Sequence, residues 1–249
     1  MKETSKNTVQ GTWRGLQLLH RLRALRAGCV TALAAGVLSL GLMPGVSVAE
    51  IPLYKTGPDE DSSFLRFVNG TEMTLQVSSA ESESKVTLDA AHPASEFYQV
   101  PANKDIKGKF LGPKSQSDVA VKVKPGEFAS AVAIQDGDAL KQVLLREEPD
   151  DFNALKASIS LYNVDPACAV GGLQVAGRPT RLFESVAVST LQRRSINPVK
   201  LSVQLLCDGK PVGAVLDLGQ LEGGQRYTVF AVPGKAGSRI FLAVDAVFH

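Results

Sequence analysis

The chain has 249 residues, which allows one large domain or two small ones with an adequate core. Hydrophobic residues make up 44% and charged residues 21%, which is ordinary for a globular protein. Six of the 27 Lys and Arg residues, but only one of the 25 Asp and Glu residues, lie in residues 1–49, so the remainder carries 21 basic and 24 acidic side chains. That balance of about −3 excludes the strongly basic surface expected of a protein that binds nucleic acid.

The N-terminus has the three parts of a secretory signal peptide. Residues 1–26 are basic, residues 27–43 are uncharged and apolar, and small residues at Ser47 and Ala49 suit signal peptidase. We therefore predict a signal peptide at 1–49, cleavage after Ala49 and a periplasmic location. The alternative is an N-terminal membrane anchor, although the 17-residue apolar run is shorter than the about 20 residues that span a bilayer.

Two cysteines, Cys168 and Cys207, remain after cleavage. In an oxidising compartment they can form a disulfide, which would be worth about 3–4 kcal/mol for a loop of this length in the chain-entropy model. The alternative is a pair of buried thiols.

Beyond the signal peptide, short apolar or alternating runs recur between Gly, Pro, Asn and Asp residues, and no long helical period appears. The pattern predicts an all-β protein made of two small antiparallel β-sandwich domains in tandem. The strands are expected at Ser63–Val68, Met73–Val77, Lys85–Leu88, Glu96–Val100, Val119–Val123, Phe128–Ile134, Leu140–Leu145, Ala157–Asn163, Leu173–Val175, Phe183–Val188, Pro198–Leu206, Val215–Leu218, Tyr227–Val232 and Ile240–Phe248.

A charged, proline-containing stretch that begins at Glu147-Glu148-Pro149 divides these strands into two sets. It is interpreted as a linker at 147–153 between domains at 50–146 and 154–249. The alternative is a surface loop within one domain.

A weak internal repeat supports the division into two. Residues 65–69 (LRFVN) resemble residues 159–163 (ISLYN) at an offset of 94. Residues 126–134 resemble residues 224–232 at an offset of 98.

The sequence lacks the motifs of a self-contained active site. Apart from the signal peptide it has only His92 and His249, no phosphate-binding glycine loop and no G-x-S-x-G motif, so no metal and no cofactor are expected. One group of residues could be catalytic. Ser62 could act as the nucleophile, with His92 downstream as its base and Asp89 orienting His92. Its setting between β-strands argues against it, and the protein is expected not to be an enzyme.

Three stretches carry a family resemblance. They are Leu53-Tyr54 followed by residues 62–67 (SSFLRF), then Glu147-Glu148-Pro149, then residues 194–201 (RSINPVKL). In this order the chain resembles the alginate biosynthesis protein AlgF family. The resemblance implies a non-catalytic periplasmic adaptor in the O-acetylation of an exopolysaccharide, most simply alginate. It also implies two partners: a periplasmic SGNH-like acetyltransferase and a membrane-bound O-acyltransferase.

The third stretch also supplies the candidate partner-binding residues, Arg193, Arg194, Ile196, Asn197 and Pro198. A proline at a strand start suggests an edge strand, and Arg193-Arg194 suggests an exposed basic patch that could dock a partner by strand addition. The alternative is a structural strand entry. Two other functions are compatible with the sequence: a polysaccharide-binding module that presents the polymer, and an enzyme that carries acetyl on Ser62.

Overall fold

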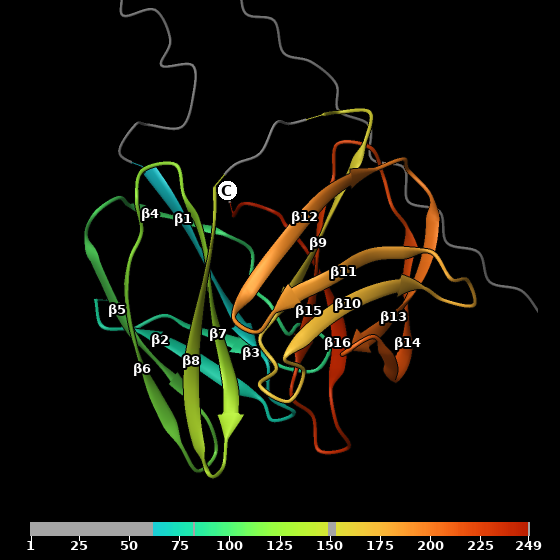
Figure 1. Ribbon diagram of the computed structural model, residues 1–249. Helices are drawn as coiled ribbons and strands as arrows, with labels where there is room; N and C mark the ends of the chain where they lie inside the picture. Colours follow the sequence, from blue (N-terminus) through green and yellow to red (C-terminus); the bar gives the residue numbers. More distant parts are fainter. Residues whose placement is uncertain (1–61, 82, 149–152, 249) are drawn as a thin grey trace, which may run out of the picture. The chain divides into compact units, whose positions relative to one another are not determined.

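The computed structural model describes residues 62–248, except residue 82 and residues 149–152. All regular structure in this part is β: sixteen strands form four four-stranded sheets, as Figure 1 shows. The predicted all-β class is confirmed. The predicted signal peptide and its cleavage site lie outside the described residues, and within them no helix could span a membrane.

The first eight strands form one β-sandwich, with sheet orders β4-β1-β7-β8 and β3-β2-β5-β6. Their bounds are β1 Ser62–Asn69, β2 Leu75–Ser79, β3 Lys85–Leu88, β4 Tyr98–Pro101, β5 Asp105–Leu111, β6 Gln116–Lys122, β7 Phe128–Asp136 and β8 Ala139–Glu147.

The last eight strands form a second sandwich, with sheet orders β12-β9-β15-β16 and β11-β10-β13-β14. Their bounds are β9 Ala157–Asn163, β10 Val170–Val175, β11 Arg181–Ala187, β12 Thr190–Ile196, β13 Lys200–Cys207, β14 Lys210–Gln220, β15 Arg226–Val232 and β16 Arg239–Val244. The predicted linker at 147–153 overlaps β8 at Glu147 and otherwise precedes β9, and its residues 149–152 lie outside the described residues.

The two sandwiches repeat one topology, since every strand of the first corresponds to the strand eight places later. The sequence repeat lies in the paired strands of this design. Asn69 of β1 is opposite Ala133 of β7, and Asn163 of β9 is opposite Ala231 of β15. These two pairs are parallel, whereas the other pairs are antiparallel. Parallel pairing is possible because the intervening strands form a long connection.

Strands β1, β7, β9 and β15 are buried on both faces. One face of β1 places Leu65 in the core of the first sandwich, and the other places Val68 in a cluster that draws on both sandwiches. That shared cluster consists of Val68, Val132, Ile134, Leu145, Tyr162, Val164, Phe230, Val232, Phe241 and Ala243. The sheet β4-β1-β7-β8 of the first sandwich and the sheet β12-β9-β15-β16 of the second, which we call the inner sheets, therefore pack against each other through a common apolar layer.

Two strands, β5 and β12, were not predicted from the sequence. In β5, Gly108 stands between Ile106 and Phe110 where an amphipathic strand would show an apolar residue, and in β12 Arg193 stands at such a position after Leu191. Their existence depends on pairing with stronger neighbours, β2 and β6 for β5 and β9 for β12.

The edge position expected for the strand after Pro198 is wrong. That strand is β13, which pairs with β10 on one side and β14 on the other. Pro198 precedes β13 by two residues, so its missing N–H removes no hydrogen bond from the ladder.

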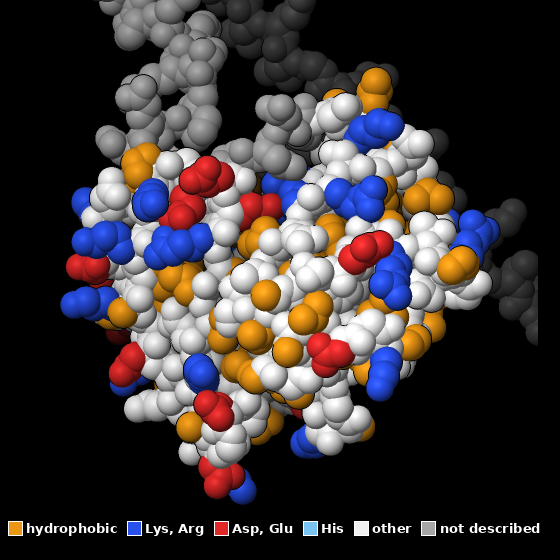
Figure 2. All heavy atoms as spheres, viewed as in Figure 1, with side chains coloured by type: hydrophobic (Ala, Val, Ile, Leu, Met, Phe, Trp, Pro, Cys, Tyr) orange, Lys and Arg blue, Asp and Glu red, His pale blue; other side chains and the backbone are white. Residues whose placement is uncertain are grey.

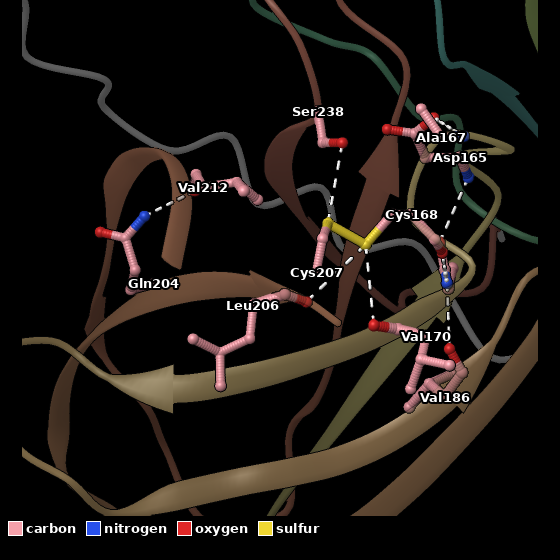
Figure 3. Close-up of a disulfide and its surroundings, with 11 residues drawn as sticks. Asp165, Ala167, Cys168, Val170, Val186, Gln204, Leu206, Cys207, Val212 and Ser238 are labelled. Atoms are coloured by element: carbon pink, nitrogen blue, oxygen red, sulfur yellow. Dashed lines mark hydrogen bonds between the residues drawn. A yellow bond between two sulfur atoms is a disulfide. The ribbon is translucent and has the colours of Figure 1, made fainter. Parts of the chain in front are cut away.

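A disulfide joins Cys168 and Cys207 (Figure 3). Cys168 lies in the turn after β9, where its N–H donates to Asp165 O at 3.0 Å, and Cys207 ends β13. The bond thereby ties the entry of β10 to the β13–β14 hairpin. Ser238 of the β15–β16 loop packs against it, with Oγ 3.7 Å from Cys207 Sγ.

We expect a chain that begins at residue 50 to contain no free thiol when it is unfolded without reductant. A thiol titration in denaturant measures this directly, and two free thiols per chain would contradict the disulfide.

Replacing both cysteines, Cys168→Ser with Cys207→Ser, is expected to lower the free energy of unfolding by about 3–4 kcal/mol, because the unfolded chain gains the entropy of the opened loop. Urea denaturation of both proteins under oxidising conditions tests this.

Candidate functional site

Ser62 and His92 lie at opposite ends of β1. The eight residues of this strand span about 23 Å at about 3.3 Å per residue. His92 is next to Pro93, whose carbonyl accepts the N–H of Asn69 at 2.7 Å, at the far end from Ser62. Ser62 Oγ accepts a hydrogen bond from Gln99 Nε2 at 2.6 Å, and the His92 side chain is 82% exposed. The set proposed from Ser62, Asp89 and His92 therefore does not assemble.

Arg66 is a charged residue with no solvent exposure, and it lies between the two sandwiches. Its Nε donates to Ser130 Oγ of β7 at 2.7 Å. Its Nη1 donates to Asp245 Oδ1 at 2.6 Å and its Nη2 to Thr228 Oγ1 of β15 at 3.1 Å, so two of its three partners belong to the second sandwich. The guanidinium carbon lies 4.4 Å from the ring centre of Phe97, which adds a cation–π contact.

Arg193, a candidate partner-binding residue, belongs to the same network. Its side chain is 6% exposed, so the expected exposed patch at Arg193-Arg194 is wrong for this residue. The guanidinium binds both carboxylate oxygens of Glu147, through Nε to Oε1 and through Nη2 to Oε2 at 2.9 Å. Nη2 also donates to Asp245 Oδ2 at 2.8 Å, and Tyr162 Oη donates to Glu147 Oε2 at 2.7 Å. Arg193 turns inward because these two buried carboxylates need a cation.

The electrostatics of this network follow from burial and pairing. Burial alone would raise the pKa of Asp245, but Arg66 and Arg193 hold that pKa below its usual value. Burial would lower the pKa of the Arg193 guanidinium, but its hydrogen bonds to Glu147 and the charge of Asp245 raise it. Burial raises the pKa of Tyr162 above its ordinary range. All three groups therefore keep fixed charge states near neutral pH, which suits a structural role better than acid–base catalysis.

Arg194 is exposed and lies beside the open edge of β12. Its Nη1 donates to the carbonyl of Leu182 in β11 at 2.9 Å, and Gln192 Nε2 donates to the carbonyl of Ser185 at 2.7 Å. Both β11 and β12 are edge strands of their sheets, and these side chains bridge them. Docking by strand addition at β12 would have to displace this bridge.

The β12–β13 connection, residues 197–199, presents the remaining candidates. Asn197, Pro198 and Val199 are all exposed, with Val199 at 43%. Lys156 Nζ donates to Asn197 Oδ1 and so joins the connection to the segment before β9, where Leu155 is 81% exposed. Figure 2 shows hydrophobic side chains at this upper end of the sandwich, with Lys and Arg side chains close by.

A groove of about 520 Å³ lies between this connection and the β10–β11 turn. We call it the C-terminal groove; it is lined by Val175, Ala176, Arg178, Thr180, Leu182, Ile196, Asn197, Val199, Lys200, Leu201 and Ser202. Two of the predicted residues, Ile196 and Asn197, line it. Arg178 and Lys200 were not among the predicted site residues, although Lys200 lies within the stretch that carries the family resemblance. The sequence does carry a signal for Arg178, because a cation between Gly177 and Pro179 is expected to lie exposed in a turn.

The chemistry available here is that of binding. Among the described residues no group of three or more His, Cys, Asp and Glu side chains could hold a metal ion. The C-terminal groove offers apolar contacts and cations, but its lining contains neither a nucleophile–histidine pair nor a carboxylate.

Comparison with known proteins agrees with the resemblance carried by the sequence. The family model described as "Alginate O-acetyl transferase AlgF" matches residues 35–228. The alginate biosynthesis protein AlgF of Pseudomonas putida is 28% identical over 198 residues, covering 80% of this chain and 85% of that protein. The protein of the same name from Pseudomonas fluorescens is 29% identical over 209 residues, covering 83% and 88%.

Among solved structures, the C-terminal domain of AlgF from P. aeruginosa matches with 22% identity and a TM-score of 0.31. The match covers 36% of this chain and 98% of that domain.

Replacing Arg193 is expected to destabilise the fold. Arg193→Met leaves Glu147 without its bidentate cation, and breaking a buried pair in this way costs about 3–5 kcal/mol. Arg194→Met is the matched control: Arg194 is exposed, and the change should stay below about 1 kcal/mol. Urea denaturation of both variants measures the difference, and equal effects would show that Arg193 is not a structural residue.

The paired state of Asp245 predicts acid sensitivity. The pKa of Asp245 is lower in the folded protein than in the unfolded chain. Its ionised form therefore stabilises the fold at any pH above the pKa of the unfolded chain, and this contribution is lost as the pH falls through the pKa of the folded protein. We expect the free energy of unfolding to decrease between about pH 5 and pH 2. Asp245→Asn should be less stable at neutral pH and show a smaller decrease, measured by urea denaturation across this range. An unchanged slope would contradict the assignment.

Proposed function

The chain belongs to the AlgF family, whose curated members are alginate biosynthesis proteins, and from this premise we propose that it is a non-catalytic adaptor required for O-acetylation of alginate. The adaptor acts in the periplasm, to which the signal-like residues 1–49 would direct it. It holds a periplasmic SGNH-like acetyltransferase, supplied with acetyl groups by a membrane-bound O-acyltransferase, near the exported polymer.

One observation carries the proposal: the stretch most specific to the family forms an exposed surface without catalytic groups. Asn197, Pro198 and Val199 face solvent, and Ile196 lines the C-terminal groove. Apolar residues that serve folding alone lie mostly inside a sandwich, whereas exposed apolar residues beside a groove are typical of a protein–protein contact.

The absence of an assembled nucleophile supports the same role. Ser62 is buried at one end of β1 and is bound by Gln99, while His92 is exposed at the other end. Acetyl transfer through a serine requires a base within hydrogen-bond reach of its hydroxyl. The transfer chemistry is therefore assigned to the partners.

The rival function, presentation of the polymer, has one supporting observation. Arg178 and Lys200 at the C-terminal groove could pair with the carboxylates of a uronate polymer. Aromatic side chains, on which sugar rings commonly stack, do not line this groove. We therefore favour a protein as its occupant.

The proposal is tested by deleting the gene and measuring the O-acetyl content and total yield of the secreted exopolysaccharide. We expect the acetyl content to fall sharply while the yield holds, since the adaptor serves the modification and not polymerisation. The wild-type gene should restore acetylation, and so should Ser62→Ala with His92→Ala, because neither residue takes part in chemistry. Unchanged acetylation in the deletion strain would overturn the proposal. If the double variant folds well but does not restore acetylation, the protein itself acts as an enzyme through Ser62 and His92.

A further inference from the structure

We propose that the C-terminal groove receives an extended peptide segment of a protein partner in which acidic and apolar side chains alternate. The inference rests on the proposed adaptor function and names the chemistry of the partner at that surface. It follows from three properties of the groove: its lining, its unpaired cations and its neighbours.

More than half of the lining residues are apolar, and the lining comes from two segments of the chain. Val175 and Leu182 come from the β10–β11 hairpin, and Ile196, Val199 and Leu201 come from the β12–β13 segment. The two walls are held in place by the N–H of Ala176, which donates to the carbonyl of Ser202 at 2.9 Å. The groove is thus formed in the absence of a partner, and an apolar side chain can enter it without a large rearrangement.

The cations around the groove have no carboxylate partner in the part of the chain that the structure describes. Arg178 and Lys200 line the groove and are exposed, yet neither has a carboxylate oxygen within 4.0 Å among those residues. The Arg194 guanidinium lies beside the groove, on the carbonyl of Leu182. Three cations in or beside the groove give a local positive potential that favours an acidic occupant, although the whole chain beyond residue 49 is slightly acidic.

One carboxylate near the groove offsets part of this positive charge. Asp217 of β14 accepts hydrogen bonds from Ser202 Oγ at 3.1 Å and from the N–H of Gly219 at 3.0 Å. These two donors, together with the charge of Lys200, lower the pKa of Asp217 and keep it ionised. Asp217 therefore weakens the field of Lys200 but forms no ion pair with it, and the donors of Lys200 and Arg178 stay open to a partner's carboxylates.

The shape of the surface favours an extended segment over a helix or a folded face. Val199 of the lining is exposed, and so is Leu155, which lies outside the groove. Leu155 precedes Lys156, whose Nζ binds Asn197 of the lining, so the two apolar side chains can extend the contact beyond the groove. A strand-like peptide places successive side chains on opposite sides, so that apolar residues can face the groove while acidic residues reach the cations on the rim.

The test uses the full exported chain and the periplasmic SGNH-like acetyltransferase of the same pathway. Their dissociation constant is measured at about 0.15 M salt for the wild type and for Arg178→Glu with Lys200→Glu. The matched control is Lys85→Glu with Lys104→Glu, which changes the charge equally at exposed lysines of the first sandwich. We expect the groove variant to bind at least about tenfold more weakly and the control to bind within about twofold of wild type. High salt should shrink the difference.

A zero-length carbodiimide cross-link then identifies the partner segment. We expect Lys200 Nζ to couple to an Asp or Glu of the acetyltransferase that is flanked by apolar residues. A complex that forms with wild-type affinity when both cations are reversed overturns the inference and leaves the adaptor function intact. So does coupling of Lys200 only to carboxylates of its own chain. The absence of any complex overturns both proposals. Alginate oligomers that bind the wild type but not the groove variant would assign the groove to the polymer instead.

Discussion

The packing of the two sandwiches depends on one buried cation. Arg66 cannot leave the interface without taking away one of the two cations that balance the buried Asp245, and Asp245 in turn holds Arg193. Such ion networks contribute little net stability compared with apolar packing, because desolvation offsets much of the attraction. What they supply is direction: the donors of a planar guanidinium fix where the facing strands must lie. The apolar layer around Phe230 and Val132 provides the attraction, and Arg66 selects one arrangement of it.

The repeat makes this role clearer. At the offset of 94, Arg66 in the first sandwich corresponds to Ser160 in the second, and at the offset of 98 Ser130 corresponds to Thr228. All four lie on the inner faces, and Ser160 Oγ donates to Thr228 Oγ1 at 3.0 Å. The same position thus carries a long cation in one half and a small hydroxyl in the other. The two halves can interlock because they differ here, although their topology is the same.

The sequence predicted the fold class and most strands, because alternating apolar runs and turn residues are local signals. It could not predict β12, whose Gln192 and Arg194 bind carbonyls of a strand from the other sheet, or the burial of Arg193, whose carboxylate partners lie 46 and 52 residues away. Of the candidate site, Ile196 and Asn197 were found through the family resemblance. Arg178 was missed because the groove is made by the β10–β11 hairpin and the β12–β13 connection, which are adjacent only in space.

The parallel pairs also determine the order in which the chain can fold. Phe64 of β1 pairs with Phe128 of β7, and Ser158 of β9 pairs with Arg226 of β15. Strands β1 and β9 can therefore complete their pairing only after more than 60 later residues are available. Arg66 meets Asp245 across 179 residues, almost the whole folded region. Contacts this distant in sequence slow folding, because a large loop entropy is lost before they form. A chain emerging N-terminus first would therefore hold the Arg66 guanidinium on its first sandwich without its carboxylate partner until the residues after β16 arrive.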